Sequence, residues 1–149
     1  MSDYTYDCIV KKVVDGDTAD VDIDLGFDVW LKDQRVRFMG IDTPESRTSD
    51  KVEKVFGNYA KEYVKSFIPV GSKQELITFK DGTGKFGRIL GDFVVEHEGK
   101  QVQLCQLMID QHVGVAYFGQ SKDDIEGEHL ENRRVLLENG SISDTDLPT

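Results

Sequence analysis

Acidic and basic side chains of the kind that handle phosphate groups lie on three separated segments of this chain. The first is Asp15-Gly16-Asp17-Thr18, the second runs from Arg37 to Glu45, and the third contains Gly87-Arg88. Phosphoryl transfer requires positive charge around the phosphate oxygens, a metal ion that organises them, and a base that orients the attacking water. Asp, Asp, Glu, Arg and Arg, with no His or Cys among them, are therefore suited to cleaving a phosphodiester with one hard cation.

The composition predicts a single globular domain with a hydrophobic core. The chain has 149 residues, of which 38% are hydrophobic and 31% charged, as in ordinary globular proteins. No apolar run approaches the length of a membrane span, and the first residues lack the pattern of a signal peptide. We expect no membrane association, a monomer, and either a cytoplasmic location or a mature secreted form. Cys8 and Cys105 are far apart in the sequence, and we expect two buried thiols rather than a disulfide.

The net charge of −10 argues against a nucleic-acid partner, because phosphate contacts dominate the affinity of proteins for nucleic acids. One interpretation is a locally basic groove on an acidic body, and the other is that the chain never meets a polyanion. The first is favoured by basic residues within the three segments or close to them, namely Lys11, Lys12, Arg35, Arg37, Lys80, Lys85 and Arg88. On that interpretation binding is weak and strongly dependent on salt.

Hydrophobic patterns predict the elements that position these residues. We expect five strands, at residues 6–14, 18–25, 34–41, 74–80 and 88–95, with a turn at 26–33. Helices are predicted at 50–67, 102–111 and 124–139, and the first has the clearest i, i+3, i+4, i+7 repeat. Arg37 and Asp42 are an odd number of positions apart, so in a regular strand their side chains would point to opposite faces. A bend must therefore separate them, and the pre-proline turn at residues 42–44 could supply it. The polar, acidic residues 140–149 are expected to be disordered, which leaves residues 1–139 as the domain.

Three motifs in this order resemble the staphylococcal nuclease family over about residues 8–130. They are V-D-G-D-T at 14–18, R-x-x-x-I-D-T-P-E at 37–45 and K-F-G-R at 85–88. Each motif alone is weak, but the ordered set is specific. The resemblance implies an α+β fold, a five-stranded OB-fold-type barrel with three helices, and five strands with a helix after the third match that topology.

The resemblance also implies a role for each site residue. Asp17, Asp42 and the carbonyl of Thr43 match the family's Ca²⁺ ligands, and oxygen donors of this kind suit a hard cation. Glu45 matches the general base. Arg37 and Arg88 match two arginines whose planar forks grip phosphate oxygens. Without the resemblance, the aspartates would be turn residues and the arginines ordinary surface side chains.

Two further positions match residues that contact the nucleic acid in the family. Lys85 corresponds to a lysine that contacts phosphate, and Tyr117 to a tyrosine that packs on a base. The chain departs from the family at three positions next to these two residues. Gly84 and Phe86, on either side of Lys85, replace an acidic residue and a tyrosine, and Gly119, near Tyr117, replaces another tyrosine. An aromatic stacking platform is typically worth about 1–3 kcal/mol per base, so substrate affinity and base preference are altered more than the reaction type.

The sequence thus predicts a calcium-dependent nuclease. We expect a thermonuclease-type endo- or exonuclease that hydrolyses DNA and RNA with little sequence preference and favours single strands. By resemblance, it leaves 3′-phosphates. The alternative is a non-catalytic OB-fold module that binds nucleic acid or protein, which the acidic charge and the missing tyrosines favour.

Overall fold

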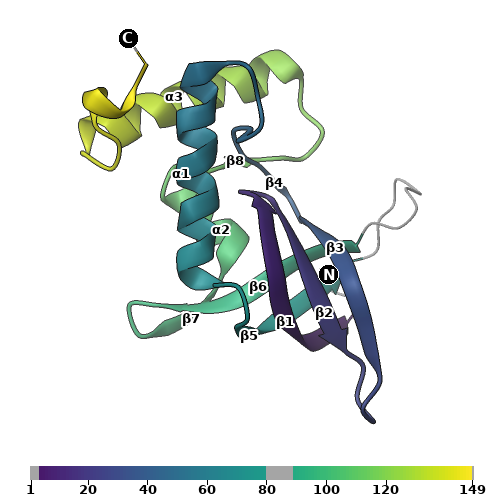
Figure 1. Cartoon of the computed structure of the whole chain (residues 1–149). Helices are drawn as coiled ribbons and strands as arrows, with labels where there is room; N and C mark the ends of the chain where they lie inside the picture. The colour runs from purple at the N-terminus through teal and green to yellow at the C-terminus, as the bar shows by residue number, and fades with distance from the viewer. Residues whose placement is uncertain (1–3, 80–88, 149) are drawn as a thin grey trace.

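A computed structural model describes residues 4–79 and 89–148 of the chain (Figure 1). Its elements in chain order are β1 (Tyr4–Asp15), β2 (Thr18–Asp24), β3 (Trp30–Phe38), β4 (Ile41–Asp42), α1 (Lys51–Phe67), β5 (Lys73–Phe79), β6 (Ile89–His97), β7 (Lys100–Gln103), α2 (Leu104–Asp110), β8 (Val115–Ala116), α3 (Lys122–Glu138) and the 3-10 turn η1 (Asp144–Asp146). No helix in the described ranges combines the length and the apolar character that crossing a membrane would take.

Five strands close into a barrel. Antiparallel pairs join β3 to β2, β2 to β1, β1 to β5 and β5 to β6. A short parallel pairing between β3 and β6, with Val36 opposite Ile89 and Arg37 opposite Leu90, closes the ring. The hairpin strand β7 extends the sheet beyond β6. With α1, α2 and α3 around it (Figure 1), this is the predicted α+β, OB-fold-type barrel with three helices, and that prediction is confirmed.

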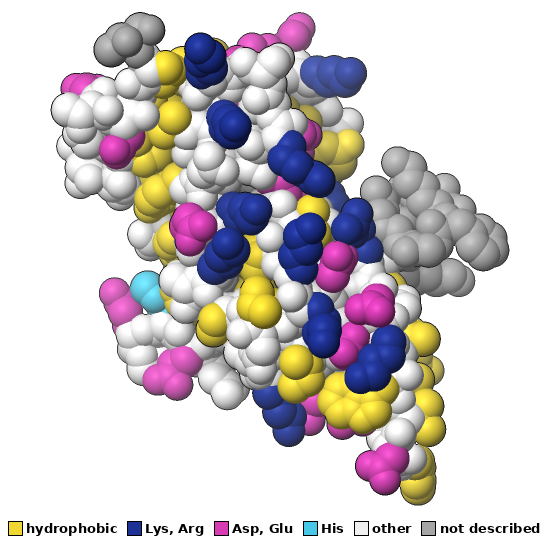
Figure 2. Space-filling model, in the orientation of Figure 1, with side chains coloured by type: hydrophobic (Ala, Val, Ile, Leu, Met, Phe, Trp, Pro, Cys, Tyr) yellow, Lys and Arg dark blue, Asp and Glu magenta, His cyan; other side chains and the backbone are white. Residues whose placement is uncertain are grey.

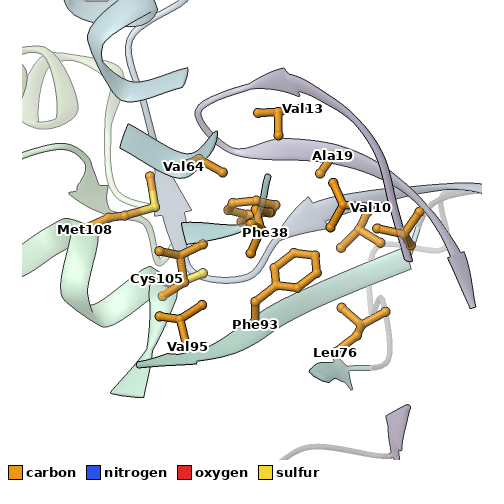
Figure 3. Close-up of a cluster of buried hydrophobic side chains, with 14 of the residues drawn as sticks. Val10, Val13, Ala19, Phe38, Val64, Leu76, Phe93, Val95, Cys105 and Met108 are labelled. Carbon is orange, nitrogen blue, oxygen red and sulfur yellow. The ribbon is translucent and has the colours of Figure 1, made fainter. Parts of the chain in front are cut away.

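The hydrophobic core fills the barrel and continues beneath α1 and α2. Phe38 and Phe93 meet edge to face at its centre, with ring centroids 5.4 Å apart (Figure 3). Around them lie fully buried side chains from the barrel strands and both helices, among them Val10, Val21, Val36, Leu76, Val64 and Met108. Cys8 and Cys105 are buried in this cluster as free thiols, so the prediction of two buried thiols is confirmed.

Helix α1 begins at an N-cap that the sequence encodes locally. The Asp50 carboxylate accepts hydrogen bonds from the backbone N–H groups of Val52 and Glu53, both at 3.0 Å, which satisfies donors that the first helical turn leaves free. The helix ends at Phe67, two residues before Pro69. It lies within the range predicted from the hydrophobic repeat.

Helix α2 is capped from a distant strand rather than from its own N-terminus. Its N-cap residue, Gln103, makes no side-chain capping bond. Instead, Oδ1 of the buried Asp92 on β6 accepts the N–H groups of Cys105 at 3.0 Å and Phe93 at 2.8 Å. Burial raises the pKa of Asp92. The predicted start of this helix at residue 102 was wrong, because residues 100–103 pair with β6 as the strand β7.

The turn between β2 and β3 is shorter than predicted. Left-handed backbone at Gly26, Phe27 and Asp28 reverses the chain, and Leu25 and Val29 close the turn with a 2.8 Å hydrogen bond. Residues 30–33, predicted as turn, belong to β3 and pair with β2. All four are exposed, so no hydrophobic alternation marks them as a strand.

The C-terminal segment packs onto α1 and α3, whereas the sequence predicted disorder from residue 140. Ile142 is 3% exposed and contacts a small second core that contains Phe56 and Leu136. Ser143 and Asp146 form a capping box around η1. A single apolar side chain in a polar segment was too weak a signal to predict this contact.

Candidate active site

Two of the predicted metal ligands and one of the predicted arginines meet at one end of the barrel. Arg37 Nη2 lies 3.6 Å from Asp17 Oδ2 and 3.9 Å from Asp42 Oδ1. The other guanidinium nitrogen, Nη1, donates to the carbonyl of Phe38 at 2.8 Å. Because both carboxylates lie within 4.0 Å of one nitrogen atom, the three side chains form a single site.

A bend between Arg37 and Asp42 brings them to the same side, as their odd spacing requires. The bend lies at Met39-Gly40 and not at the predicted residues 42–44. Gly40 adopts a left-handed φ of 74°, which turns the chain there. The next two residues form β4, which pairs with β8, and Gly40 accepts a 2.8 Å hydrogen bond from the N–H of Tyr117. Strands of two residues carry no readable pattern, so β4 and β8 were not predicted.

Asp17 is held from several directions and is largely shielded from solvent. Its Oδ2 accepts the N–H of Thr43 at 3.3 Å, and its Oδ1 accepts the hydroxyl of Thr18 at 3.0 Å. Burial raises the pKa of Asp17, while the Arg37 charge and these hydrogen bonds oppose that rise. The N–H contact brings Thr43, the residue whose carbonyl is predicted as a ligand, next to Asp17.

Carboxylates from β1 and α1 fix the loop that carries Glu45. Asp15 Oδ1 accepts the Ser46 hydroxyl at 2.6 Å and the Ser46 N–H at 3.2 Å. Glu53 Oε2 accepts the N–H of Glu45 at 3.0 Å. Sequence reasoning gave Asp15 and Ser46 no role, although Asp15 belongs to the V-D-G-D-T motif. Both act through contacts between segments that are far apart in the chain.

Glu45 combines solvent access with a strongly negative environment. The residue is exposed, so water can reach it. Its pKa is nevertheless raised, first by partial desolvation against the loop and then by the negative charges of Asp15, Asp17, Glu53 and Asp42. A carboxylate with increased proton affinity and free access to water is well placed to accept a proton.

A glycine in α1 allows the Glu45 loop to lie against the helix. A Cβ at Gly57 would overlap the carbonyl of Glu45 and stand 2.6 Å from Ser46 N. These are backbone atoms, which cannot move aside as the end of a side chain can. Gly57 was not among the predicted site residues, although an isolated glycine inside a helical pattern often has a packing reason.

Gly57→Ala is therefore expected to displace Glu45 and to slow catalysis. Alanine in a helix gains roughly 1 kcal/mol over glycine, but overpacking of this kind costs about 1–3 kcal/mol, so we expect net destabilisation. A misplacement near 1 Å typically lowers a rate by about 10²-fold. Chemical unfolding and nuclease assays measure the two effects.

Gly127→Ala is the matched control for this prediction, since Gly127 is also helical and a Cβ added there would have nothing within 4 Å of it. It should keep the cleavage rate and show only the gain in helix propensity. Equal stability and equal rates in the two variants would contradict the role assigned to Gly57.

The oxygen donors at the site are of the kind that Ca²⁺ takes. Asp17 and Asp42 carry carboxylates within 4.0 Å of one Arg37 nitrogen, and Thr43, whose N–H binds Asp17, carries the backbone carbonyl predicted as the third ligand. Within residues 4–79 and 89–148, no group of three or more His, Cys, Asp and Glu side chains is arranged to hold a metal ion, so water would have to complete the shell, as it commonly does for Ca²⁺. Four carboxylates surround Glu45, and among the described residues Arg37 is the cation within 4.0 Å of two of them. A bound cation would offset the excess negative charge of this described cluster.

The predicted nucleic-acid contacts fall partly outside the described residues. Arg88 and Lys85 lie there, as do Gly84 and Phe86. Tyr117 is described and is 46% exposed. It lines a cleft of about 420 Å³ that also contains Asp42, Pro44 and His129. Tyr117 is thus placed beside the aspartate site with an accessible ring, as a base-packing residue requires.

The face of the molecule in Figure 2 carries Lys and Arg side chains interleaved with acidic ones. Besides Arg37, two of the residues assigned to a basic groove have acidic partners on the barrel. Arg35 Nε lies 2.9 Å from Asp20 Oδ1, and Lys11 Nζ lies 3.6 Å from Asp22 Oδ2. Their charges are largely compensated, so they add less attraction for a polyanion than the sequence count suggests.

Comparison with known proteins links this geometry to one family. Residues 35–135 match the family model described as staphylococcal nuclease homologue. The thermonuclease of Staphylococcus intermedius is 32% identical over 98 residues, which cover 66% of this chain and 54% of that protein. The SPbeta prophage-derived endonuclease YokF of Bacillus subtilis (strain 168) is 27% identical over 145 residues, covering 93% and 46%. Endonuclease YhcR of the same strain is 30% identical over 104 residues, covering 66% and 8%. The chain thus spans about half of the length of two of these relatives and a small part of the third.

Proposed function

This chain belongs to the staphylococcal nuclease family, and we propose that it is a calcium-dependent nuclease that hydrolyses the phosphodiester bonds of DNA and RNA. The observation that carries the proposal is the meeting of Asp17 and Asp42 around Arg37, beside an exposed Glu45 with a raised pKa. The names of the three relatives, one thermonuclease and two endonucleases, support the same chemistry.

Each side chain has a definable part in the proposed reaction. Asp17, Asp42 and the Thr43 carbonyl would hold Ca²⁺, which when bound supplies positive charge for the phosphate oxygens. Glu45 accepts a proton from the attacking water. Arg37 donates its fork of N–H groups to the phosphate and stabilises the charge that develops on it. By resemblance, Arg88 is the second arginine, and the bond from phosphorus to the 5′ oxygen breaks as water attacks. That oxygen leaves and takes a proton from solvent to become a 5′-hydroxyl, and the product carries a 3′-phosphate.

The substrate is proposed to be single-stranded nucleic acid with little sequence preference. The site lies at the mouth of a barrel, where it can reach one backbone, and Tyr117 offers one ring for a neighbouring base. Gly119, with a left-handed φ of 92°, provides no second ring. The net charge of −10 further weakens binding. The attraction that remains depends on Lys and Arg contacts with phosphate, so cleavage should fall as salt is raised.

Removal of calcium is expected to abolish cleavage. Labelled single-stranded DNA, duplex DNA and RNA would be incubated at low salt with Ca²⁺, with Mg²⁺, or with a calcium chelator. We expect cleavage with Ca²⁺, fastest on single strands, and none in the chelator. Cleavage that persists in the chelator would contradict the assigned metal dependence.

The second candidate is a non-catalytic OB-fold module that binds nucleic acid or protein. The acidic charge and the glycine at position 119 favour it. Binding of a labelled oligonucleotide without turnover in Ca²⁺, by a folded protein, would establish this alternative and exclude the nuclease.

A further inference from the structure

A histidine from the last helix contacts one of the proposed metal ligands. His129 Nε2 on α3 lies 2.7 Å from Asp42 Oδ2 on β4. The His129 side chain is 14% exposed and that of Asp42 is 34% exposed. The sequence showed no clustering of histidines, and the two residues lie 87 positions apart, so this contact was not predicted.

The surroundings of the ring indicate which nitrogen carries the proton. Nδ1 of His129 is buried and has no hydrogen-bond partner within the described residues. A proton on Nδ1 would be a buried donor without an acceptor, which is costly. We therefore assign the proton to Nε2, from which it is donated to Asp42 Oδ2.

Because of this hydrogen bond, the two oxygens of Asp42 have different partners. Oδ2 is occupied by His129, while Oδ1 is turned toward Arg37 at 3.9 Å. Asp17 is held differently, by Thr43 and Thr18 from its own neighbourhood. In the part of the chain that the structure describes, the hydrogen bond that orients the Asp42 carboxylate comes from α3.

Helix α3 is anchored independently of His129. Asn132 Nδ2, one turn further along, donates to the carbonyl of Gly114 at 3.2 Å. Leu136 is buried against Phe56 in the second core. His129 therefore projects from a fixed support, which is what a residue needs in order to hold a ligand in one orientation.

We infer that His129 is a positioning residue that orients Asp42 for the cation and thereby sets the affinity of the site for Ca²⁺. The inference rests on the proposed function, because it assumes that Asp42 is a metal ligand. A half-exposed carboxylate without this partner can rotate about its side-chain torsions, and ordering it on binding lowers the affinity. Partners of this kind typically contribute about 10–100-fold in metal affinity or activity.

The test is calorimetric titration of Ca²⁺ into the full chain and its variants. His129→Phe removes the donor and keeps a ring of similar size, while His129→Gln keeps an N–H donor at similar reach. Asn132→Ala is the matched control, since it removes another α3 hydrogen bond without touching Asp42. Circular dichroism and the unfolding temperature without Ca²⁺ report whether each variant is folded.

We expect His129→Phe to weaken Ca²⁺ binding about 10–100-fold, with His129→Gln closer to the wild type. Asn132→Ala should bind Ca²⁺ as the wild type does. Wild-type affinity in His129→Phe would overturn the inference while leaving the proposed function intact. Equal weakening in Asn132→Ala would also overturn it, because His129 would then act only by docking the helix. A wild-type protein that binds no Ca²⁺ would overturn the proposed metal site itself, before any substitution is considered.

Discussion

Glu45→Gln is expected to lower the rate of phosphodiester cleavage by about 10²–10⁴-fold, the usual contribution of a general base. Glutamine has the shape of glutamate but cannot accept a proton from water. The Glu45 backbone N–H, which binds Glu53, is unaffected, so the loop should keep its conformation. The cleavage rate at saturating Ca²⁺, on labelled single-stranded DNA, measures the effect.

Glu53→Gln is the control for this prediction. It removes a negative charge from the same cluster, but its amide oxygen can still accept the N–H of Glu45. If Glu53→Gln slows cleavage as much as Glu45→Gln does, the effect is one of local charge. If Glu45→Gln keeps a rate within a few-fold of the wild type, as an order-of-magnitude criterion, Glu45 is not the base.

Arg37→Lys should lower the rate by about 10²–10³-fold, the typical loss when one donor to a developing oxyanion is removed. Lysine keeps the positive charge, but it has a single charged nitrogen in place of a planar fork. Arg37 uses that fork to contact Asp17, Asp42 and the Phe38 carbonyl together. The rate constant and the KM for an oligonucleotide, measured separately, distinguish a loss in the transition state from a loss of ground-state binding.

Arg35 provides the matched control, two residues away on the same strand. Arg35 pairs with Asp20 on the exposed surface of the barrel, away from the aspartate pair. Surface ion pairs contribute about 0–1 kcal/mol, so Arg35→Lys should leave cleavage nearly unchanged. Similar losses in both variants would mean that general positive charge, and not the Arg37 fork, supports the reaction.

The barrel was predictable because most of its strands are long and half-buried. The alternation in β2, with Val21 and Ile23 buried on one face, is a local property of the sequence. The repeat of α1 is equally local. What failed were the features that depend on tertiary contacts: β7 and the start of α2, the exposed beginning of β3, the two-residue pairing of β4 with β8, and the packing of Ile142.

The residues of the candidate site fall into the same two groups, those predicted from local motifs and those that depend on tertiary contacts. Asp17, Asp42, Glu45 and Arg37 were predicted as site residues because they lie in short ordered motifs, and they are close together in the structure. Asp15, Gly57 and His129 act on residues at least 11 positions away in the chain, and no local pattern encodes such a contact. The glycine inside the α1 repeat was the one signal that could have pointed to a close backbone approach.

The parallel pairing of β3 with β6 determines how late in folding the site is formed. Arg37 lies in this pairing opposite Leu90, and Asp42 receives its hydrogen bond from residue 129. Contacts between residues so distant in sequence form late in folding, because a long loop must first close. During synthesis, the chain therefore contains both aspartates long before the contacts that position their side chains can form. Under the proposed activity, the RNA around the nascent chain meets a complete site only after the chain has been made as far as His129.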